Sequence, residues 1–481
     1  MNWRATIAAG LIFIALLGFV WLETRQRVAG EGEVFRHRLF GLNLYGIDAD
    51  NVTKLRVERH GEEPFLLEKR GEHWFITEPI SAMASDDEVG RMIREIAELR
   101  PKTTREGVDL SRSDFGLEQP DITATITYDG NRTATLSLGA ETPAGAERYA
   151  KVSADDNLHV VAATLRTTLW RDPETLREKR LVKIETDDVH SVTLDHGDEH
   201  VVAVRGSEGA ATPWSLTAPL ATAGDEWNLR QLVDNVRDLR ADDFLSSDEV
   251  EDANPGFESP QATVKLDLAG GRSLTITFGN TASRDVENAE AERELVYATT
   301  SERDEILLVE AAALDRVRKT TFDLRDKSVV SFDRRDVTRI RVERTEDFSF
   351  SVGSRPDGWR VETPKSVEAR QGAIDDILWN LEDLSAIEFV SEDADQRELR
   401  EHGLAVPQTA ITIEITGRRQ PLKVLIGRQT ADGNYYAMTS ESNQIVKVSE
   451  FLMTDLPDSI EDLEKGEMDL PAWDDLFDDG T

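Results

Sequence analysis

A histidine-rich stretch is the segment of the sequence whose residue types come closest to a metal site. It combines three histidines with three carboxylates: His190, Asp195, His196, Asp198, Glu199 and His200. His196 and His200 flank an expected turn, so their side chains could meet across a hairpin, and imidazole with carboxylate suits zinc. Related segments of the chain carry no such histidines, and exposed hairpins are commonly polar. We therefore expect a solvated turn, with a zinc site in a metal-dependent enzyme as the alternative.

Three tryptophans recur at one position of a repeated pattern. Trp74, Trp214 and Trp359 are each followed five residues later by proline, at Pro79, Pro219 and Pro364. An exposed, repeated tryptophan could stack on carbohydrate. A tryptophan that begins an inner strand is more often part of the core, because its large area dominates local packing. We expect all three rings in the core, and a carbohydrate platform is the alternative.

The C-terminal stretch is acidic and carries apolar residues among its aspartates. Trp473, Leu476 and Phe477 are the apolar residues that stand out. This composition resembles a short docking peptide that folds on a partner, and the alternative is a frayed tail. Both interpretations stay open at the level of sequence.

Several reaction types are disfavoured by what the sequence lacks. It has no cysteine, which removes thiolate catalysis and disulfides, and it has neither a Gly-Lys-Ser/Thr nor a Gly-x-Ser-x-Gly motif. The net charge is −37, from 93 acidic and 56 basic residues in a chain of 481, so the chain repels nucleic acid. We expect no enzyme activity, no cofactor and no nucleic-acid partner.

The tryptophans belong to a unit that occurs three times. After each Trp–Pro pair, apolar residues recur at the spacing of one helix face, with offsets of 140 and 145 residues and no insertion. The positions are Val89, Met92, Ile93, Ile96 and Leu99, then Leu229, Leu232, Val233, Val236 and Leu239, then Ile374, Ile377, Leu378, Leu381 and Leu384. A glycine followed four residues later by proline comes next each time, beginning at Gly116, Gly256 and Gly403. Repetition of this kind is typical of scaffolds and binding arrays.

Strands of alternating polarity surround each of these helices. Val52–Arg59 and Val337–Arg344 alternate with period two, which predicts one buried and one wet face. Hairpins are expected after each glycine–proline element, for example at Ile122–Tyr128 with 133–138. The fold class is therefore α+β: three tandem modules, each an antiparallel sheet backed by one long and one short helix.

The N-terminus differs from the rest of the chain. Residues 5–22 form an uncharged, largely apolar run that would span about 27 Å as a helix, enough for a transmembrane anchor. The flanking charges leave its orientation open. The expected organisation is an anchor at 1–22, a stalk at 23–44, modules at 45–183, 184–331 and 332–463, and an acidic tail at 464–481.

The pattern resembles the bacterial domain-of-unknown-function 4340 (DUF4340) family. The resemblance is carried by the apolar N-terminus, the Val-Thr-x-Ile/Leu-x-Val-Glu-Arg strand, the Trp-to-Pro segment, the Gly-Leu-x-x-Pro element and the Leu-Arg-Asp-Lys-Ser linker at 324–328. It implies a single-pass protein of the bacterial inner membrane whose bulk is periplasmic. It also implies a partner, namely an ABC-2-type transporter permease or a gliding-type auxiliary membrane protein.

These observations lead to three functional hypotheses. We expect a non-enzymatic, membrane-anchored interaction or scaffold protein that is an accessory of an ABC-2-type transport or cell-envelope complex. An array of modules that binds a glycan or peptide is the first alternative. A metal-dependent enzyme that uses His190, His196 and His200 is the second.

Overall fold

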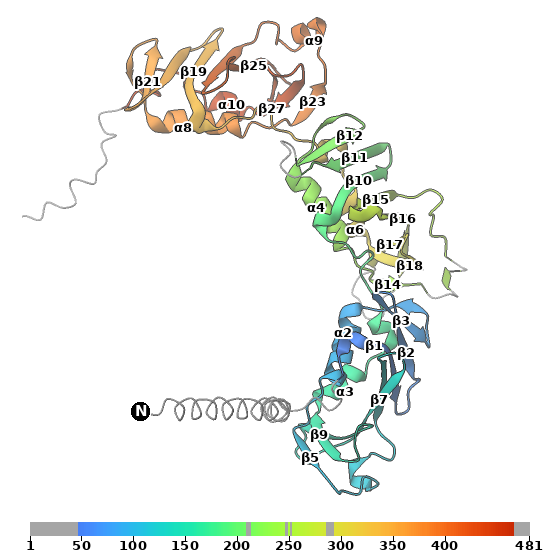
Figure 1. Ribbon diagram of the computed structural model, residues 1–481. Coiled ribbons are helices and arrows are strands. Elements are labelled where there is room, and N and C mark those ends of the chain that lie inside the picture. Colours follow the sequence, from blue (N-terminus) through green and yellow to red (C-terminus); the bar gives the residue numbers. More distant parts are fainter. Residues whose placement is uncertain (1–46, 208–212, 246–248, 251–252, 285–292, 466–481) are drawn as a thin grey trace, which may run out of the picture. The chain divides into compact units, whose positions relative to one another are not determined.

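Three antiparallel sheets follow one another along the chain, each with nine strands in the same order (Figure 1). The computed structural model describes residues 47–207, 213–245, 249–250, 253–284 and 293–465. Helices accompany each sheet, which confirms the prediction of three tandem α+β modules. We call them modules 1, 2 and 3.

The nine strands of each sheet lie side by side in one spatial order, which differs from their order in the sequence. Module 1 has β4 (Ala82–Met83), β3 (His73–Glu78), β2 (Phe65–Arg70), β1 (Val52–Arg59), β6 (Ile122–Tyr128), β7 (Arg132–Glu141), β8 (Glu147–Val152), β9 (Leu158–Ala162) and β5 (Thr103–Arg105). Module 2 has β13 (Thr222–Ala223), β12 (Trp214–Ala218), β11 (Glu199–Arg205), β10 (Val189–His196), β15 (Ala262–Leu268), β16 (Ser273–Arg284), β17 (Arg293–Thr300), β18 (Arg303–Glu310) and β14 (Asp243–Phe244). Module 3 has β22 (Val367–Glu368), β21 (Gly358–Thr363), β20 (Phe350–Arg355), β19 (Val337–Arg344), β24 (Thr409–Ile415), β25 (Leu422–Gln429), β26 (Tyr435–Thr439), β27 (Ile445–Val448) and β23 (Glu388–Ser391).

The central strand pair of each sheet joins residues that are distant in sequence. In module 1, Leu55 of β1 lies opposite Leu67 of β2 and Ile126 of β6. In module 3, Ile340 holds the same place between Val352 and Ile413. The strand that follows the long helix in sequence (β5, β14 or β23) lies at the far edge of its sheet. The chain therefore crosses the whole sheet face between β4 and β5, and the helix covers that face.

Alternating polarity explains which residues form the core. Along β6, β15 and β24 every second residue is buried, as a period-two strand with one covered face requires. Ile122, Ala124 and Ile126 are fully buried in β6, and Ile411 and Ile413 are fully buried in β24. Each sheet thus has one apolar face, and the long helix packs on it.

Helices close each module. The long helices are α2 (Asp86–Ala97), α4 (Glu226–Arg237) and α8 (Gln371–Glu382). The shorter helices are α3 (Thr164–Leu169), α6 (Ala311–Val317), α7 (Thr321–Leu324), α9 (Gln396–Glu401) and α10 (Phe451–Thr454). Single 3₁₀ turns are η1 (Ala49–Asn51), η2 (Ser113–Phe115), η3 (Pro173–Leu176), η4 (Thr186–Asp188), η5 (Ala269–Gly271) and η6 (Arg334–Asp336). Every apolar stripe position named for the three long helices is buried.

The repeated glycines are required by close backbone approach. Gly116, Gly256 and Gly403 have φ between 63° and 74°, which side chains rarely tolerate. A Cβ atom on Gly139 of β7 would lie 2.0 Å from the carbonyl oxygen of Phe115, and one on Gly279 would lie 1.8 Å from that of Pro255. The glycine turn therefore packs directly against the hairpin strand, which only glycine on both sides permits.

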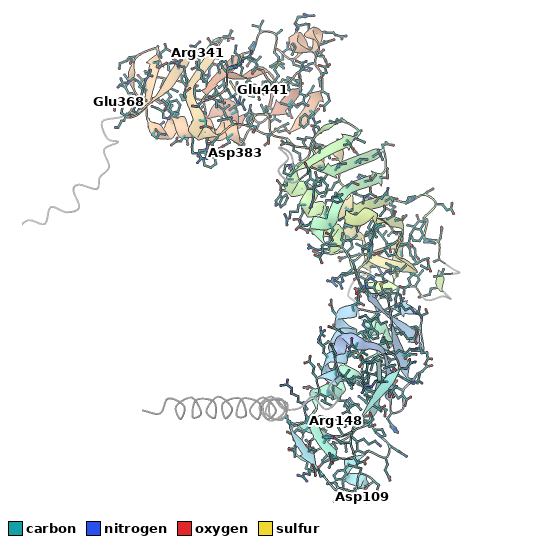
Figure 2. All side chains as sticks on the ribbon, viewed as in Figure 1. Asp109, Arg148, Arg341, Glu368, Asp383 and Glu441 are labelled. Atoms are coloured by element: carbon teal, nitrogen blue, oxygen red, sulfur yellow. The ribbon has the colours of Figure 1, made fainter. Side chains whose placement is uncertain are left out.

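The chain divides into two compact units. Of the described residues, one unit comprises those up to Glu185 together with those within Asn235–Thr263 and Leu274–Leu314. The other comprises the described residues within Thr186–Asp234 and Val264–Ser273 and those from Asp315 to Lys465. The linker from module 1 to module 2 and its contacts therefore lie inside the first unit. The linker from module 2 to module 3 lies inside the second. Charged side chains such as Arg341, Asp383 and Glu441 project from the ribbon into solvent (Figure 2).

The prediction of a single-pass inner-membrane protein is wrong when tested against the length and apolarity of the described helices. Within the described ranges no helix is both long and apolar enough to cross a bilayer. The longest, α2, α4 and α8, have 12 residues each, about 18 Å at 1.5 Å per residue, against a hydrocarbon core of about 30 Å. The predicted anchor at 5–22 and stalk at 23–44 lie outside the described residues.

Candidate binding groove

The three equivalent tryptophans differ in exposure. Trp74 and Trp214 are 5% and 2% exposed, whereas Trp359 is only half-buried. Each stands in the strand that precedes its proline, and the bonds Glu78–Pro79, Ala218–Pro219 and Thr363–Pro364 are all cis. The strand and its cis proline are therefore the same in module 3 as in the other two modules, but the indole ring of Trp359 is partly open to solvent.

The cross-strand neighbour explains why the ring of Trp359 is open. Arg205 lies opposite Trp214, and its guanidinium carbon is 5.0 Å from the centre of the indole ring. The Arg205 guanidinium is held there by the carbonyl oxygens of Thr186 and Asp187, each at 3.0 Å. Ser354 takes this place opposite Trp359, and its short side chain leaves the ring uncovered.

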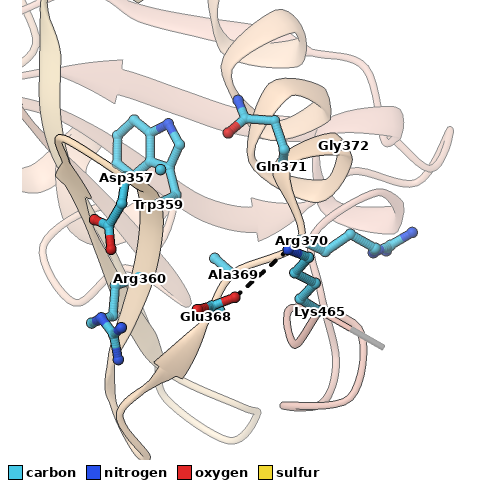
Figure 3. A pocket seen from close by; sticks show the side chains of 10 residues that line it. Asp357, Trp359, Arg360, Glu368, Ala369, Arg370, Gln371, Gly372 and Lys465 are labelled. Atoms are coloured by element: carbon cyan, nitrogen blue, oxygen red, sulfur yellow. Dashed lines mark ion pairs between the residues drawn. The ribbon is translucent and has the colours of Figure 1, made fainter. Parts of the chain in front are cut away.

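Two pockets lie beside Trp359, and this ring and Gln371 line both of them. The first, of about 510 Å³, lies between the hairpin at Asp357–Arg360 and the start of α8 (Figure 3). The second, of about 680 Å³, lies toward η6 and includes Ser354 and Arg335. We call the two together the Trp359 groove.

The first pocket is lined by three cations, two of which have no carboxylate partner among the described residues. Within the described chain Arg360 and Arg370 form no ion pair, and Arg370 donates to the carbonyl oxygen of Asp462 at 2.9 Å. Lys465 also lines the pocket and approaches Glu368 at 3.7 Å. Asp357 and Glu368 line the same pocket, so its three cations exceed its carboxylates by one, in a chain of net charge −37.

The second pocket has a more balanced rim. Arg334 pairs with Glu382 at 2.5 Å and lies over the ring of Trp379 at 3.6 Å. The Arg335 guanidinium hydrogen-bonds Asp333 at 2.6 Å and lowers the pKa of that carboxyl to about 2. The Arg335–Asp333 pair lies in solvent, so this side of the second pocket is polar and exposed.

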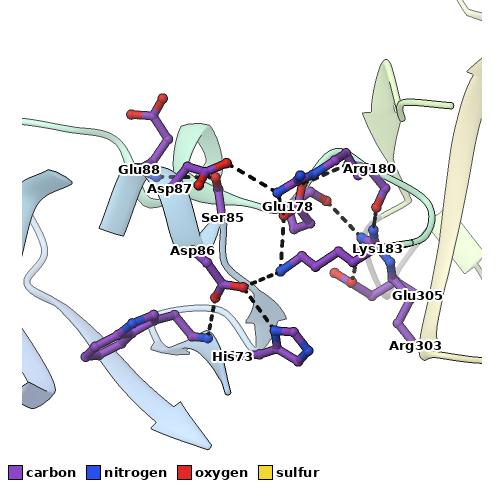
Figure 4. Close-up of polar contacts among 11 residues, drawn as sticks. His73, Ser85, Asp86, Asp87, Glu88, Glu178, Arg180, Lys183, Arg303 and Glu305 are labelled. Atoms are coloured by element: carbon purple, nitrogen blue, oxygen red, sulfur yellow. Dashed lines mark hydrogen bonds and ion pairs between the residues drawn. The ribbon is translucent and has the colours of Figure 1, made fainter. Parts of the chain in front are cut away.

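Module 1 fills the corresponding space with its own linker. Asp86, at the position of Gln371, accepts a hydrogen bond from Lys183 at 2.6 Å, another from the Trp74 amide at 2.8 Å, and contacts His73 at 3.0 Å (Figure 4). Burial alone would raise the pKa of Asp86, but these hydrogen bonds, led by that from Lys183, outweigh burial and lower it. The network covers the start of α2 and includes the backbone amide of Trp74.

The same network extends into module 2. Glu178 is 2% exposed and pairs with Arg180 and Lys183, both at 3.2 Å. Burial alone would raise the pKa of Glu178, but hydrogen bonds from Arg180 outweigh burial and lower it. Arg303, from β18, donates to the carbonyl oxygens of Glu178 and Arg180, and burial lowers its pKa.

Sequence reasoning missed the arginines that join consecutive modules. Arg177 lies over Phe244 at 3.8 Å and pairs with Glu305 at 2.6 Å. Arg325, at the same linker position, lies over Phe389 at 3.2 Å and makes a bidentate pair with Glu392. The repeated Leu-Arg at 176–177 and 324–325 was the available signal.

The histidine-rich stretch does not assemble a metal site. His190 is exposed, Nε2 of His196 meets the carbonyl oxygen of Lys319 at 3.0 Å, and Nδ1 of His200 meets Asp195 at 2.6 Å. No group of three or more potential ligands gathers anywhere in the part of the chain that the structure describes. The residues predicted to dock on a partner, Trp473, Leu476 and Phe477, lie outside the described residues.

Comparison with known proteins identifies one family. The sequence model of a domain of unknown function, DUF4340, matches residues 74–213, 214–360 and 359–467. The first two matches each begin at the tryptophan of one module and end next to the tryptophan of the following module. Their boundaries therefore fall within the sheets and not between the modules. No curated protein and no solved structure matches the chain.

Proposed function

The chain belongs to the DUF4340 family, and from this premise we propose that it is a non-enzymatic interaction protein whose third module binds an extended peptide of a partner. One observation carries the proposal. Of the three equivalent tryptophans, Trp74 and Trp214 are buried, whereas Trp359 is half-buried and borders two open pockets. Modules 1 and 2 then serve as a scaffold that holds module 3.

The chemistry of the groove fits a peptide with acidic and aromatic residues. Arg360 and Arg370 offer planar donors for carboxylates, and the indole of Trp359 offers apolar area that is already ordered. The amide of Gln371, which lines both pockets, can bond to a peptide backbone. A peptide of this kind is the ligand that matches all three groups.

A selection of displayed random peptides on the full chain tests this proposal. Enriched peptides should share acidic and aromatic residues, and Trp359→Ala should weaken their binding about tenfold or more, as for an interface hot spot. Trp227, which is 71% exposed in module 2, supplies the matched control, since Trp227→Ala should leave binding unchanged. Equal binding by the Trp359→Ala chain would refute the proposal.

A glycan is the second candidate ligand. The half-buried indole beside Gln371 and Asp357 resembles a sugar-stacking platform, because sugar rings pack on aromatic faces while amides and carboxylates bind hydroxyls. A glycan array probed with the same variants separates the two candidates. Trp359-dependent glycan binding without peptide binding would favour this one.

The proposed partner is the one that the family resemblance implies, an ABC-2-type transporter permease or a gliding-type auxiliary protein. The proposed role is that of an accessory which holds such a partner by an extended segment. Co-purification of a candidate permease with the wild-type chain, and its loss with Trp359→Ala, is the corresponding test. Retention by both chains would place the contact elsewhere.

A further inference from the structure

The Trp359 groove has an occupant available within the same chain. We propose that residues 467–477 bind in this groove in cis and compete with the partner peptide, so that the acidic tail regulates access. The inference rests on the proposed function, because it deepens the role of the same groove.

The chain leaves module 3 in the way that it leaves module 1. In module 1, Ala84 bridges Arg177, and the amide of Ser85 donates to the carbonyl oxygen of Leu176 at 2.8 Å. In module 3, Ala369 bridges Glu464, and the amide of Arg370 donates to the carbonyl oxygen of Leu463 at 2.7 Å. Lys465 therefore takes the place of Glu178.

The continuation of the linker in module 1 covers the start of the long helix. Arg180 reaches Asp87 at 3.3 Å, and Lys183 reaches Asp86 at 2.6 Å. The equivalents of these two carboxylates in module 3 are Gly372 and Gln371, which line the first pocket. The proposal therefore places Glu467 and the residues near Leu470, which have the same spacing from Lys465, at this pocket.

The charges of the two contacts are reversed. In module 1 a basic linker meets acidic residues at the start of α2. In module 3 the pocket is lined by Arg360, Arg370 and Lys465 against Asp357 and Glu368, and Arg360 and Arg370 have no carboxylate partner among the described residues. The tail that follows contains no Lys or Arg, and its carboxylates are Glu467, Asp469, Asp474, Asp475, Asp478 and Asp479. The proposed contact of the tail would thus pair opposite charges, as the linker contact in module 1 does. Trp473 supplies an aromatic residue a short stretch of chain after Lys465.

Tethering makes this contact effective even if it is weak. Trp473 is separated by a short segment from Lys465, which already lines the pocket. A short flexible connection gives an effective concentration of about 1 mM, so a contact with a dissociation constant of about 10 μM would be filled in roughly 99% of molecules. A partner peptide then binds about 100-fold more weakly to the wild-type chain than to a chain whose tail is disabled.

The first experiment measures the position of the tail directly. The chain has no cysteine, so spin labels on Asp376→Cys, an exposed site on α8, and Thr481→Cys report one distance distribution in the full chain. We expect a narrow distribution that broadens with Trp359→Ala or with Trp473→Ala and stays narrow with Trp227→Ala. A wild-type distribution as broad as that of Trp473→Ala would overturn the proposal. A dipolar signal from singly labelled chains would assign the tail to a second copy and would also overturn it.

The second experiment separates this inference from the proposed function. A fluorescein-labelled peptide of residues 466–481 is titrated into the full wild-type chain and into the Trp473→Ala/Leu476→Ala/Phe477→Ala chain. The tail variant should bind the peptide at least 10-fold more tightly, and adding Trp359→Ala should abolish the gain. Equal affinity for both chains would disprove tail docking, while Trp359-dependent selected peptides would still uphold the proposed function. Loss of Trp359 dependence in both assays would reject the function and the inference together.

Discussion

Trp359 differs from its two counterparts in what lies against its ring, and its removal should have a different cost. Replacing buried Trp74 or Trp214 by alanine should lower the free energy of unfolding by about 3–5 kcal/mol, because a large cavity remains. Trp359→Ala should cost about 1–2 kcal/mol, since part of the ring is already in water. Urea unfolding of the three variants measures these differences.

Equal costs at the three positions would show that the Trp359 ring is packed as its counterparts are. Trp227→Ala is the control, because a ring that is 71% exposed should contribute little. The residue type is thus repeated in all three modules while its surroundings are not.

The Arg325–Glu392 pair makes a pH-dependent contribution. The hydrogen bond from Arg325 lowers the pKa of Glu392 below its ordinary value of 4.5. A carboxyl whose folded pKa is lowered stabilises the fold fully above its unfolded pKa, and the effect is lost as pH falls through the folded value. The free-energy difference between the wild-type chain and Glu392→Gln should therefore shrink from about pH 6 to about pH 3.

Unfolding titrations at a series of pH values give this difference. Glu401→Gln, on the exposed helix α9, serves as the control and should change the free energy of unfolding little. A gap that widened on acidification would contradict the assigned sign.

At the level of elements, the linkers are held by stacked arginine and phenylalanine. Phe244→Ala or Phe389→Ala removes the ring beneath Arg177 or Arg325 and should free the adjoining linker. Trypsin should then cut within 177–183 or 325–327 about tenfold faster, because each 1.4 kcal/mol of lost local stability raises the open population tenfold. Peptide mass mapping of timed digests locates the cuts.

Phe451→Ala is the matched change, since this ring is 68% exposed and stacks on no linker arginine. Faster cleavage in this variant as well would trace the effect to general destabilisation. Unchanged cleavage in Phe244→Ala and Phe389→Ala would show that the stacking does not hold the linkers.

Central elements could be predicted from the sequence, and edge elements could not. Ile122–Tyr128 alternates strictly with period two, and Val52–Arg59 alternates from Leu55 onward, after a register shift between Val52 and Lys54. The structure has both strands with the predicted bounds. The two-residue strands β4, β13 and β22 carry too few residues for any periodicity, and they pair only because the preceding strand lies beside them. The far-edge position of β5 depends on long-range pairing with β9, which local pattern does not encode.

At the scale of the whole molecule, the first and last modules depart from the junction pattern. Thr104 stands where Phe244 and Phe389 stack, and Glu464 stands where the linker arginines stand. Pro101, which has no N–H, replaces Ala241, whose amide donates to the carbonyl oxygen of Lys179 at 2.7 Å. Terminal repeats are typically altered so that further copies do not add.

We therefore predict that the chain does not assemble head to tail with other copies. Sedimentation velocity over a hundredfold concentration range should give one constant, monomeric coefficient. A coefficient that rises with concentration would contradict this prediction.

The large negative charge should make stability depend on salt. With a net charge of −37, self-repulsion disfavours the compact state, and raising salt from about 0.05 to about 0.5 M shortens the screening length. The melting temperature should rise with sodium chloride, as followed by calorimetry. Sucrose of equal osmolality controls for solute effects, and a falling melting temperature would show that ion pairs outweigh repulsion.

The modular plan followed from periodicity, and the binding groove did not. Repeated spacing specifies which residues face the core, because burial of a stripe or an alternating face depends only on local geometry. The three tryptophans look alike in sequence, yet Arg205 lies over the ring of Trp214 while the short Ser354 stands opposite Trp359, and both neighbours lie on other strands. Such neighbours come together only when the chain folds, and so the open face of Trp359 is a property of the folded molecule.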